Sequence, residues 1–390
     1  MTGDRIKASV SKPATSQTTK SLTTKPATSQ ATKPAKSQTT KTRSAKHHLP
    51  VKHLVDVRRI CPSQARKWQR WAEKGEAVRL ARGVYIPASL WREIGQDPNA
   101  EAIKAQAYIV AEYLRYTHKI PALAAGKTAA FLHGLPLERF GPPETVELAS
   151  PKRAMMGKNG RSERYLAAPG QGRRAVPIAT EFGKIWASGL LDTCHELGLR
   201  HSLDDAVIAT EAALHTKKLT WREWREWLEW QEGLCHPETK PHALNRKGTQ
   251  RARTAARLIT PCSESPRESQ LKIRFWEGGL PAPLQQVNIL NANGWTIGRV
   301  DMFFDVGLAV EYDGREKYGT TEEAVQRALL QERQRENEIQ ARGITLLRVT
   351  ADTYHTGTAI RQVSEHFSLL AARPTRPPST LFSGGTPAWS

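Results

Sequence analysis

The sequence has few cysteines, and the four that it contains are scattered. Cys61, Cys194, Cys235 and Cys262 form no CxxC pair, so we expect reduced thiols rather than a disulfide framework or a zinc site. A long apolar run is also missing, which argues against a transmembrane helix and a membrane partner. No apolar stretch follows the first basic residues, so we expect no secretory signal and a cytoplasmic protein.

Acidic residues are scarce relative to basic ones. The chain has 58 Lys and Arg against 38 Asp and Glu, which gives a formal net charge of +20. Such an excess favours a polyanionic partner, with DNA or another nucleic acid ahead of an anionic membrane surface. At 390 residues the chain is long enough for two or three domains.

Residues 1–48 have almost no apolar side chains to bury. The segment Lys12–Gln17 recurs at Lys25–Gln30 and, in varied form, at Lys33–Gln38. This composition predicts a disordered tail. Ten basic residues stand against Asp4 alone, so the tail supplies +9 of the net charge. Two interpretations are open: a tether that contacts nucleic-acid phosphates, or a solubilising extension.

Residues 49–95 are predicted to form a winged helix. We expect a short helix over Val51–Ile60, a second helix that begins at Pro62 and ends before Gly75, and a β-ribbon that turns at Arg82–Gly83. A basic helix beside a basic wing suits DNA binding, and an ordinary helical domain with solvated charges is the alternative. The candidate DNA contacts are Arg66, Lys67, Arg70, Arg79 and Arg82.

Residues 96–250 are predicted to be a mixed, mostly helical middle domain. Its most regular feature is a tryptophan at every third position from Trp221 to Trp230. On a helix these residues form an aromatic stripe. The stripe could stack nucleic-acid bases, but packing against neighbouring helices is the favoured interpretation.

A hairpin of carboxylates lies near the C-terminal end. Asp301 and Glu311 are symmetric about Val306, so a simple antiparallel pairing places them opposite each other. Asp313 shares a face with Glu311. Like charges at such positions destabilise a sheet, and a divalent metal held by Asp301, Glu311 and Asp313 would remove the repulsion. A solvated polar face with another register is the alternative.

Further polar residues surround this hairpin. Glu268 follows Ser265 in a capping-box pattern and could also lie beside the carboxylates. Glu332 and Arg335 fall on the apolar stripe of a long helix over 322–342, where they either point into a site or form an i, i+3 ion pair. We expect residues 258–370 to fold as helix, three-strand meander, helix and strand, and residues 371–390 to be a disordered tail.

This order resembles the restriction-endonuclease-like fold of the PD-(D/E)xK superfamily. It is more similar to the DUF559 group, which is related to very-short-patch-repair endonucleases. The resemblance rests on Ser263–Ser269, Gly298–Asp301, Val310–Gly314, Lys317–Gly319, Glu332–Glu336 and Arg348–Thr350. Upstream, Leu80–Tyr85 and Thr128–Pro136 resemble AbiEi-type antitoxins. The resemblance implies an α+β and α/β multidomain protein in which a DNA-binding front end is fused to a nuclease-like domain.

The resemblance also implies a chemistry. Asp301 and Glu311 would bind Mg²⁺, assisted by Asp313 or Glu268, and the metal would activate water for phosphodiester hydrolysis. The superfamily's lysine position is Asp313 here, so Lys317 or Arg335 would replace that lysine. The alternative is a non-enzymatic, antitoxin-like transcriptional regulator with an inactive nuclease fold and a cognate toxin as its partner.

Overall fold

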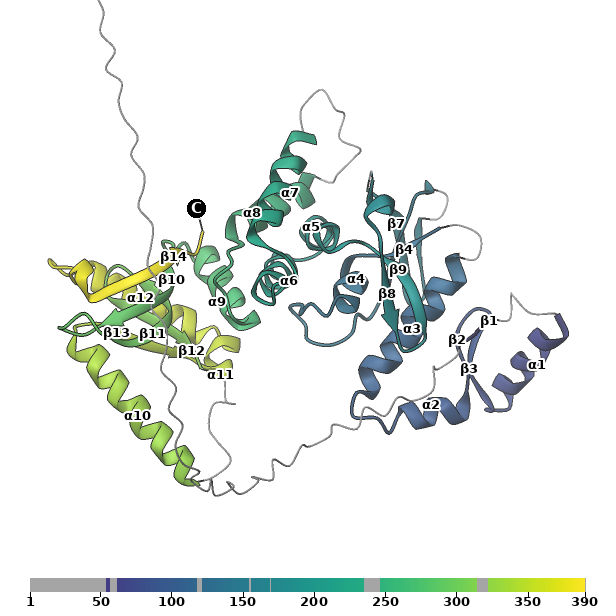
Figure 1. Ribbon diagram of the computed structural model, residues 1–390, viewed down its shortest axis with the longest axis horizontal. Helices are drawn as coiled ribbons and strands as arrows, with labels where there is room; N and C mark the ends of the chain where they lie inside the picture. Colours follow the sequence, from purple (N-terminus) through teal and green to yellow (C-terminus); the bar gives the residue numbers. More distant parts are fainter. Residues whose placement is uncertain are drawn as a thin grey trace, which may run out of the picture. The chain divides into compact units, whose positions relative to one another are not determined.

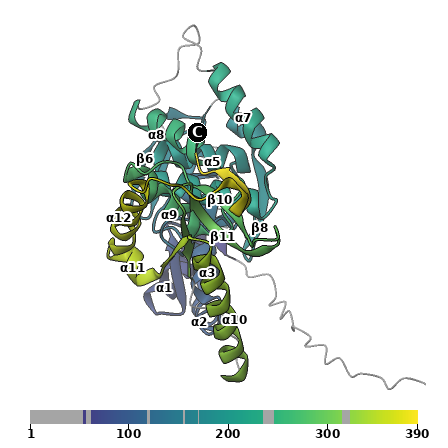
Figure 2. The same ribbon diagram turned by 90° about the vertical axis from the view of Figure 1, so that its left-hand side faces the viewer.

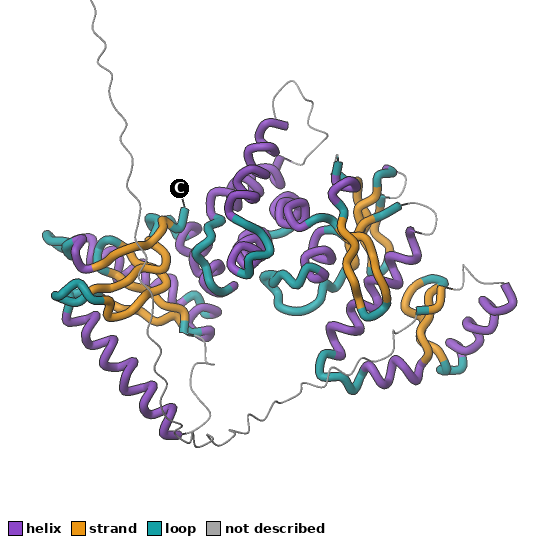
Figure 3. Tube along the Cα trace, viewed as in Figure 1, coloured by secondary structure: helices purple, strands orange, loops and turns teal. Residues whose placement is uncertain are grey.

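The computed structural model describes residues 54–56, 62–117, 121–153, 156–168, 170–234, 246–313 and 322–389. The predicted tail over 1–48 therefore lies outside the described residues. The chain is a mixed α/β protein with three separate sheets, visible as three groups of orange strands in Figure 3. None of the described helices is both long enough and apolar enough to cross a bilayer.

The first described module is built around a small three-stranded sheet of order β1-β3-β2. Its elements are β1 (Val55–Asp56), α1 (Pro62–Glu73), β2 (Ala77–Ala81), β3 (Val84–Pro87) and α2 (Ala88–Ile94). The expected ribbon is present, and its turn places Gly83 at φ +79°, a conformation that favours glycine. The inner face of α1 packs on β3 through Trp68 and Tyr85, whose ring centroids are 6.2 Å apart.

The sequence predicted a helix over Val51–Ile60, but the structure has strand β1 at the centre of this range. Val55 and Asp56 pair instead with Tyr85 and Val84 of β3. These residues form a strand because the edge of β3 supplies backbone hydrogen-bond partners, which a local sequence pattern does not reveal. The remainder of that predicted helix lies outside the described residues, apart from Leu54.

The middle of the chain contains a six-stranded mixed sheet of order β6-β7-β5-β4-β9-β8, followed by helices. The helices agree with the prediction of a mixed, mostly helical domain, but the sequence analysis did not predict this sheet. The strands are short and several are polar, which hides them from a search for apolar alternation. The elements are α3 (Ala100–Thr117), β4 (Leu123–Ala124), α4 (Gly126–Leu132), β5 (Val146–Ser150), β6 (Gly157–Asn159), β7 (Ser162–Leu166), η3 (Gln171–Arg174), β8 (Val176–Thr180), β9 (Gly183–Ala187), α5 (Leu190–Arg200), α6 (Leu203–His215), α7 (Trp221–Leu234) and α8 (Arg246–Leu258).

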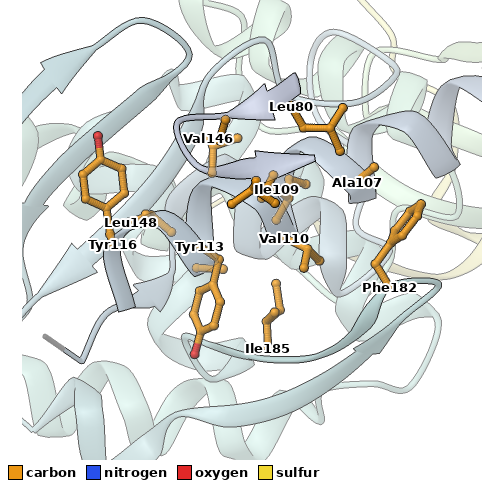
Figure 4. Packing of buried hydrophobic residues seen from close by; sticks show 14 of the residues in the cluster. Leu80, Ala107, Ile109, Val110, Tyr113, Tyr116, Val146, Leu148, Phe182 and Ile185 are labelled. Atoms are coloured by element: carbon orange, nitrogen blue, oxygen red, sulfur yellow. The ribbon is translucent and has the colours of Figure 1, made fainter. Parts of the chain in front are cut away.

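Helix α3 joins the first module to this sheet. Ile109 of α3 lies in one buried cluster with Leu80 of β2 and Leu148 of β5 (Figure 4). Ile185 of β9 belongs to the same cluster. The first module and the middle sheet thus share one apolar core.

Helix α7 presents its tryptophans in the way that core packing predicts. Trp224 and Trp227 are 2% and 7% exposed and pack with neighbouring helices. Trp221 is half-buried, and Trp230 at the end of the stripe is exposed. A stripe with period three drifts around a helix with 3.6 residues per turn, so its ends leave the buried face.

The last body is a five-stranded sheet of order β13-β12-β11-β10-β14, in which β13 is parallel to β12 (Figure 1). Phe275 of α9 and Val363 of α12 pack in one cluster, and Ile339 of α10 packs in the other. Figure 2 shows α12 at the left of the view and α10 running down below β11. The elements are α9 (Pro266–Glu277), β10 (Leu284–Leu290), β11 (Thr296–Phe304), β12 (Leu308–Tyr312), α10 (Glu322–Ala341), β13 (Thr345–Val349), α11 (Ala351–His355), α12 (Thr358–Ala371), η4 (Ser379–Leu381) and β14 (Phe382–Pro387).

The expected disordered tail over 371–390 is corrected by the structure. Strand β14 pairs antiparallel with β10 and forms the edge of the sheet. Gly385 has φ +90°, and a Cβ atom there would lie 2.7 Å from Val287 Cγ2, so a larger residue does not fit. Trp389 then packs into the apolar clusters. A glycine-rich segment gains its order here from its partner strand.

A buried ion pair connects the middle helices to the last body. Lys272 of α9 is 0% exposed, and its ammonium group contacts the carboxylate of Glu211 of α6. Glu211 also accepts hydrogen bonds from Thr260 N at 2.7 Å and from the Ser269 hydroxyl at 2.6 Å. These contacts fix α9, which carries Glu268, against α6.

Candidate nucleic-acid interface and carboxylate site

The outer face of α1 is basic. Arg66, Lys67 and Arg70 are exposed, whereas Trp68 and Trp71 are half-buried, and Trp68 packs against Tyr85 of β3. Arg66 and Arg70 are four residues apart and therefore share one face of the helix. The Lys67 ammonium lies 4.4 Å from the centroid of the Trp71 ring. The packed tryptophans hold the helix in place while its basic residues face outward.

The ribbon adds two more of the predicted contacts. Arg79 of β2 and Arg82 at the turn are both exposed. Within the part of the chain that the structure describes, no carboxylate pairs with any of the five basic side chains predicted to contact DNA. Their charges are therefore available to an external anion.

The carboxylate hairpin has the predicted register. Met302 pairs with Val310 and Phe304 with Leu308, which places Asp301 opposite Glu311. Gly307 takes φ +87° in the turn. The Asp301 carboxylate accepts a hydrogen bond from the backbone N–H of Tyr312 at 2.8 Å. The hairpin thus brings two of the predicted site residues together.

Arg335 neutralises Glu311. Its guanidinium donates to both oxygens of Glu311, with the shortest N–O distance at 2.8 Å, and donates to Glu332 at 2.7 Å. The predicted i, i+3 pair between Glu332 and Arg335 is therefore present, and it extends to the sheet. Arg348 of β13 contacts the same Glu332 carboxylate. The side chain of Arg335 crosses Gly298, where a Cβ atom would lie 2.9 Å from Nη1.

The charges in this network shift one another's protonation. Hydrogen bonding and the positive charge of Arg335 lower the pKa of Glu332. Hydrogen bonds to Glu311 and Glu332 raise the pKa of Arg335, against the opposing effect of burial. Both shifts favour the ionised forms, so Glu332 and Arg335 stay charged at neutral pH.

Glu268 has the structural role expected of a capping residue. Ser265 accepts a hydrogen bond from Glu268 N, and the Glu268 carboxylate accepts from the Ser265 hydroxyl and from Glu264 N. Burial raises the pKa of Glu268. Its carboxylate also accepts from the side-chain amide of Gln286 at 3.0 Å. This last contact brings Glu268 to the sheet.

Gln286 is a residue of this site that the sequence did not reveal. Gln285 pairs with Met302 and Val287 with Val300, so Gln286 lies level with Asp301. It has φ +55°, which is rare for a residue other than glycine, and its Oε1 is buried without a hydrogen-bond partner among the described residues. Backbone strain and an unsatisfied polar atom are typical of functional sites, but neither leaves a signal in the sequence.

In this arrangement Glu311, a predicted Mg²⁺ ligand, is paired with Arg335. Carboxylate oxygens are suitable donors, but both oxygens of Glu311 are already held by Arg335. Across the described ranges, no group of three or more His, Cys, Asp or Glu side chains could hold a metal ion. Asp313 lies directly after the end of β12; its backbone N–H donates to Val349 O, and its side chain is half-buried. Lys317 lies outside the described residues.

No protein-family model matches the sequence, and no curated protein matches it. Among solved structures, the crystal structure of the RV2827C protein from Mycobacterium tuberculosis aligns with a TM-score of 0.31 and 14% sequence identity. That alignment covers 56% of this chain and 75% of the other chain. At this similarity the match carries no conclusion about function.

Proposed function

We propose that this chain is a DNA-binding protein in which residues 54–95 act as a winged helix. The observation that carries the proposal is the set of five exposed basic side chains on α1 and its ribbon, none of which is paired with a carboxylate of the described residues. Helix α1 would enter the major groove, and Arg82 at the ribbon turn would contact the phosphate backbone.

The packing of α1 supports this use. A recognition helix must be held rigidly so that its outer residues meet base edges in a fixed register. Trp68 contacts Trp71 at a centroid distance of 5.0 Å and Tyr85 of β3 at 6.2 Å. These contacts anchor the inner face and leave Arg66 and Arg70 to contact DNA from the other face.

In this proposal the last body has a restriction-endonuclease-like fold but does not cleave DNA. Its order of helix, three-strand meander, helix and parallel strand supports the fold. The bidentate bond from Arg335 to Glu311 supports a non-enzymatic role, because it occupies the carboxylate that a metal would need. A transcriptional regulator of the antitoxin kind is consistent with both features.

The second candidate is a Mg²⁺-dependent DNA endonuclease. It is favoured by one observation, the placement of Asp301 opposite Glu311 with Gln286 level with them. Incubation of plasmid DNA with Mg²⁺ or with EDTA separates the candidates. Metal-dependent nicking by the wild type that is abolished in Asp301→Asn and Glu311→Gln would establish the endonuclease, and absence of nicking supports the regulator.

A binding titration tests the first proposal. Arg66→Ala combined with Arg70→Ala should weaken binding of a duplex of about 20 base pairs by roughly 1–3 kcal/mol for each base that these arginines contact. The matched control is Arg222→Ala with Arg361→Ala, which removes the same charge from exposed, ion-paired positions on α7 and α12. Equal weakening in both variants would contradict a specific role for α1.

A further inference from the structure

A groove of about 1090 Å³ lies between α5, α7, α8 and the residues at the end of β14. Its apolar part includes Leu199, Leu228 and Ile259. Two half-buried tryptophans, Trp221 of α7 and Trp389 near the C-terminal end, also line it. The groove is large enough for a nucleotide-sized ligand, because small-molecule sites typically measure about 300–1,000 Å³.

The groove is positively charged. Arg225 of α7 and Arg253 and Arg257 of α8 line it and are exposed. No Asp or Glu is among the described residues that line it. Arg225 has a partner in Glu229, but the two atoms are 3.9 Å apart and both side chains are more than half exposed. An exposed pair of this kind contributes little, so the groove favours an anionic occupant.

His195 adds a polar group to the groove lining. Its ring packs edge-on against Trp227, and it forms no hydrogen bond with another residue that the structure describes. Burial lowers the pKa of His195 to about 4, so the imidazole is neutral at pH 7. A neutral imidazole carries one donor and one acceptor nitrogen, which together can pair with the edge of a nucleobase.

We propose that this groove binds an unpaired stretch of DNA. Trp221 and Trp389 would stack bases, Arg225 and Arg253 would contact phosphates, and His195 would meet a base edge. Aromatic stacking combined with a basic groove is the common way in which proteins bind single strands. The site is separate from α1, so it adds to the proposed duplex binding and does not require it.

Stacking is tested with two labelled oligonucleotides of about eight nucleotides, one of thymidine and one of abasic sites with the same backbone. Both should contact the basic residues 1–48 alike, since that segment has no Phe, Trp or Tyr on which bases could stack. Fluorescence anisotropy with the full chain should give about fivefold or tighter binding of the thymidine oligonucleotide, because stacking contributes roughly 1 kcal/mol or more per base.

Substitution of two tryptophans of α7, Trp221 in the groove and Trp230 outside it, tests whether stacking occurs in the groove. Trp221→Leu should lower the ratio of the two affinities, because it removes one of the two stacking side chains, and His195→Ala should also lower it. Trp230→Leu should leave the ratio unchanged, because Trp230 is 43% exposed on α7 and does not line the groove. A ratio near one in the wild type, or equal effects of the two tryptophan substitutions, would overturn the proposal.

Charge and ligand source are tested separately. Arg253→Gln should weaken binding of both oligonucleotides alike, whereas Arg222→Gln, at an exposed position of α7 that does not line the groove, should not. Thymidine monophosphate at the oligonucleotide concentration should not compete, and effective competition would overturn the assignment to a strand. The Arg66 and Arg70 variants should keep the thymidine-to-abasic ratio, so failure of duplex binding and failure of this site give different results.

Discussion

Replacement of Lys272 by methionine tests the buried connection between α6 and α9. The Lys272 ammonium contacts the Glu211 carboxylate, and its Nζ lies 3.4 Å from the Thr260 hydroxyl. Lys272 and Glu211 are 0% and 1% exposed, so water cannot replace the missing partner. Lys272→Met therefore leaves an unpaired carboxylate in the interior.

The expected cost follows from this burial. Removal of one partner from a buried ion pair destabilises a protein by about 3–5 kcal/mol. Glu211 keeps its hydrogen bonds from Thr260 N and the Ser269 hydroxyl, so we expect the lower end, about 3 kcal/mol. Glu211→Gln combined with Lys272→Met removes both charges but keeps an acceptor for Thr260 N, and should recover part of the stability.

Urea unfolding followed by circular dichroism and by tryptophan fluorescence measures this cost, provided that the two transitions coincide. The control is Lys158→Met, which breaks an exposed ion pair with Glu163 and should cost no more than about 1 kcal/mol. Equal small costs for Lys272→Met and Lys158→Met, or a double variant whose cost is the sum of the single costs, would refute the reasoning.

Three further predictions concern the carboxylate network, the middle domain and residues 1–48. Arg335→Gln should release Glu311 beside Asp301 and create a Mn²⁺ site, measured by electron paramagnetic resonance; equal Mn²⁺ binding by the wild type would contradict the blocking role of Arg335. Burial raises the pKa of Glu196 from 4.5 to about 7, so the folded chain keeps a proton that the unfolded chain loses between these values. The free energy of unfolding should therefore fall by about 3 kcal/mol as pH rises through that window, and Glu196→Gln should flatten the fall in urea titrations. Deletion of residues 1–48 should lower affinity for all DNA alike and reduce the dependence on salt, and a change in sequence preference would contradict the tether.

The sequence predicted the parts of the site that depend on local geometry. The turn at Asp305–Gly307 sets the register of its two strands, and so places Asp301 opposite Glu311. The interaction between Ser265 and Glu268 spans a single helical turn, so the sequence pattern also predicts it. The i, i+3 pair of Glu332 and Arg335 belongs to the same class.

The rest depends on contacts between distant segments. Arg335 reaches Glu311 across 24 positions, and nothing local distinguishes this from a pair confined to α10. Lys272 meets Glu211 across 61 positions. Strand β14 is glycine-rich and becomes a strand only through pairing with β10. The sequence alone therefore does not predict how a long helix and a glycine-rich edge strand pack onto a sheet.

The central claim is that α1 and its ribbon bind duplex DNA, and the dependence of affinity on salt tests it most directly. For each phosphate that a variant no longer neutralises, the slope of log affinity against log salt should become shallower by about 0.9. Arg79→Ala with Arg82→Ala should make the negative slope shallower by about one to two relative to the wild type. Arg222→Ala with Arg361→Ala should leave the slope unchanged. Identical slopes for the wild type and the ribbon variant would contradict the claim.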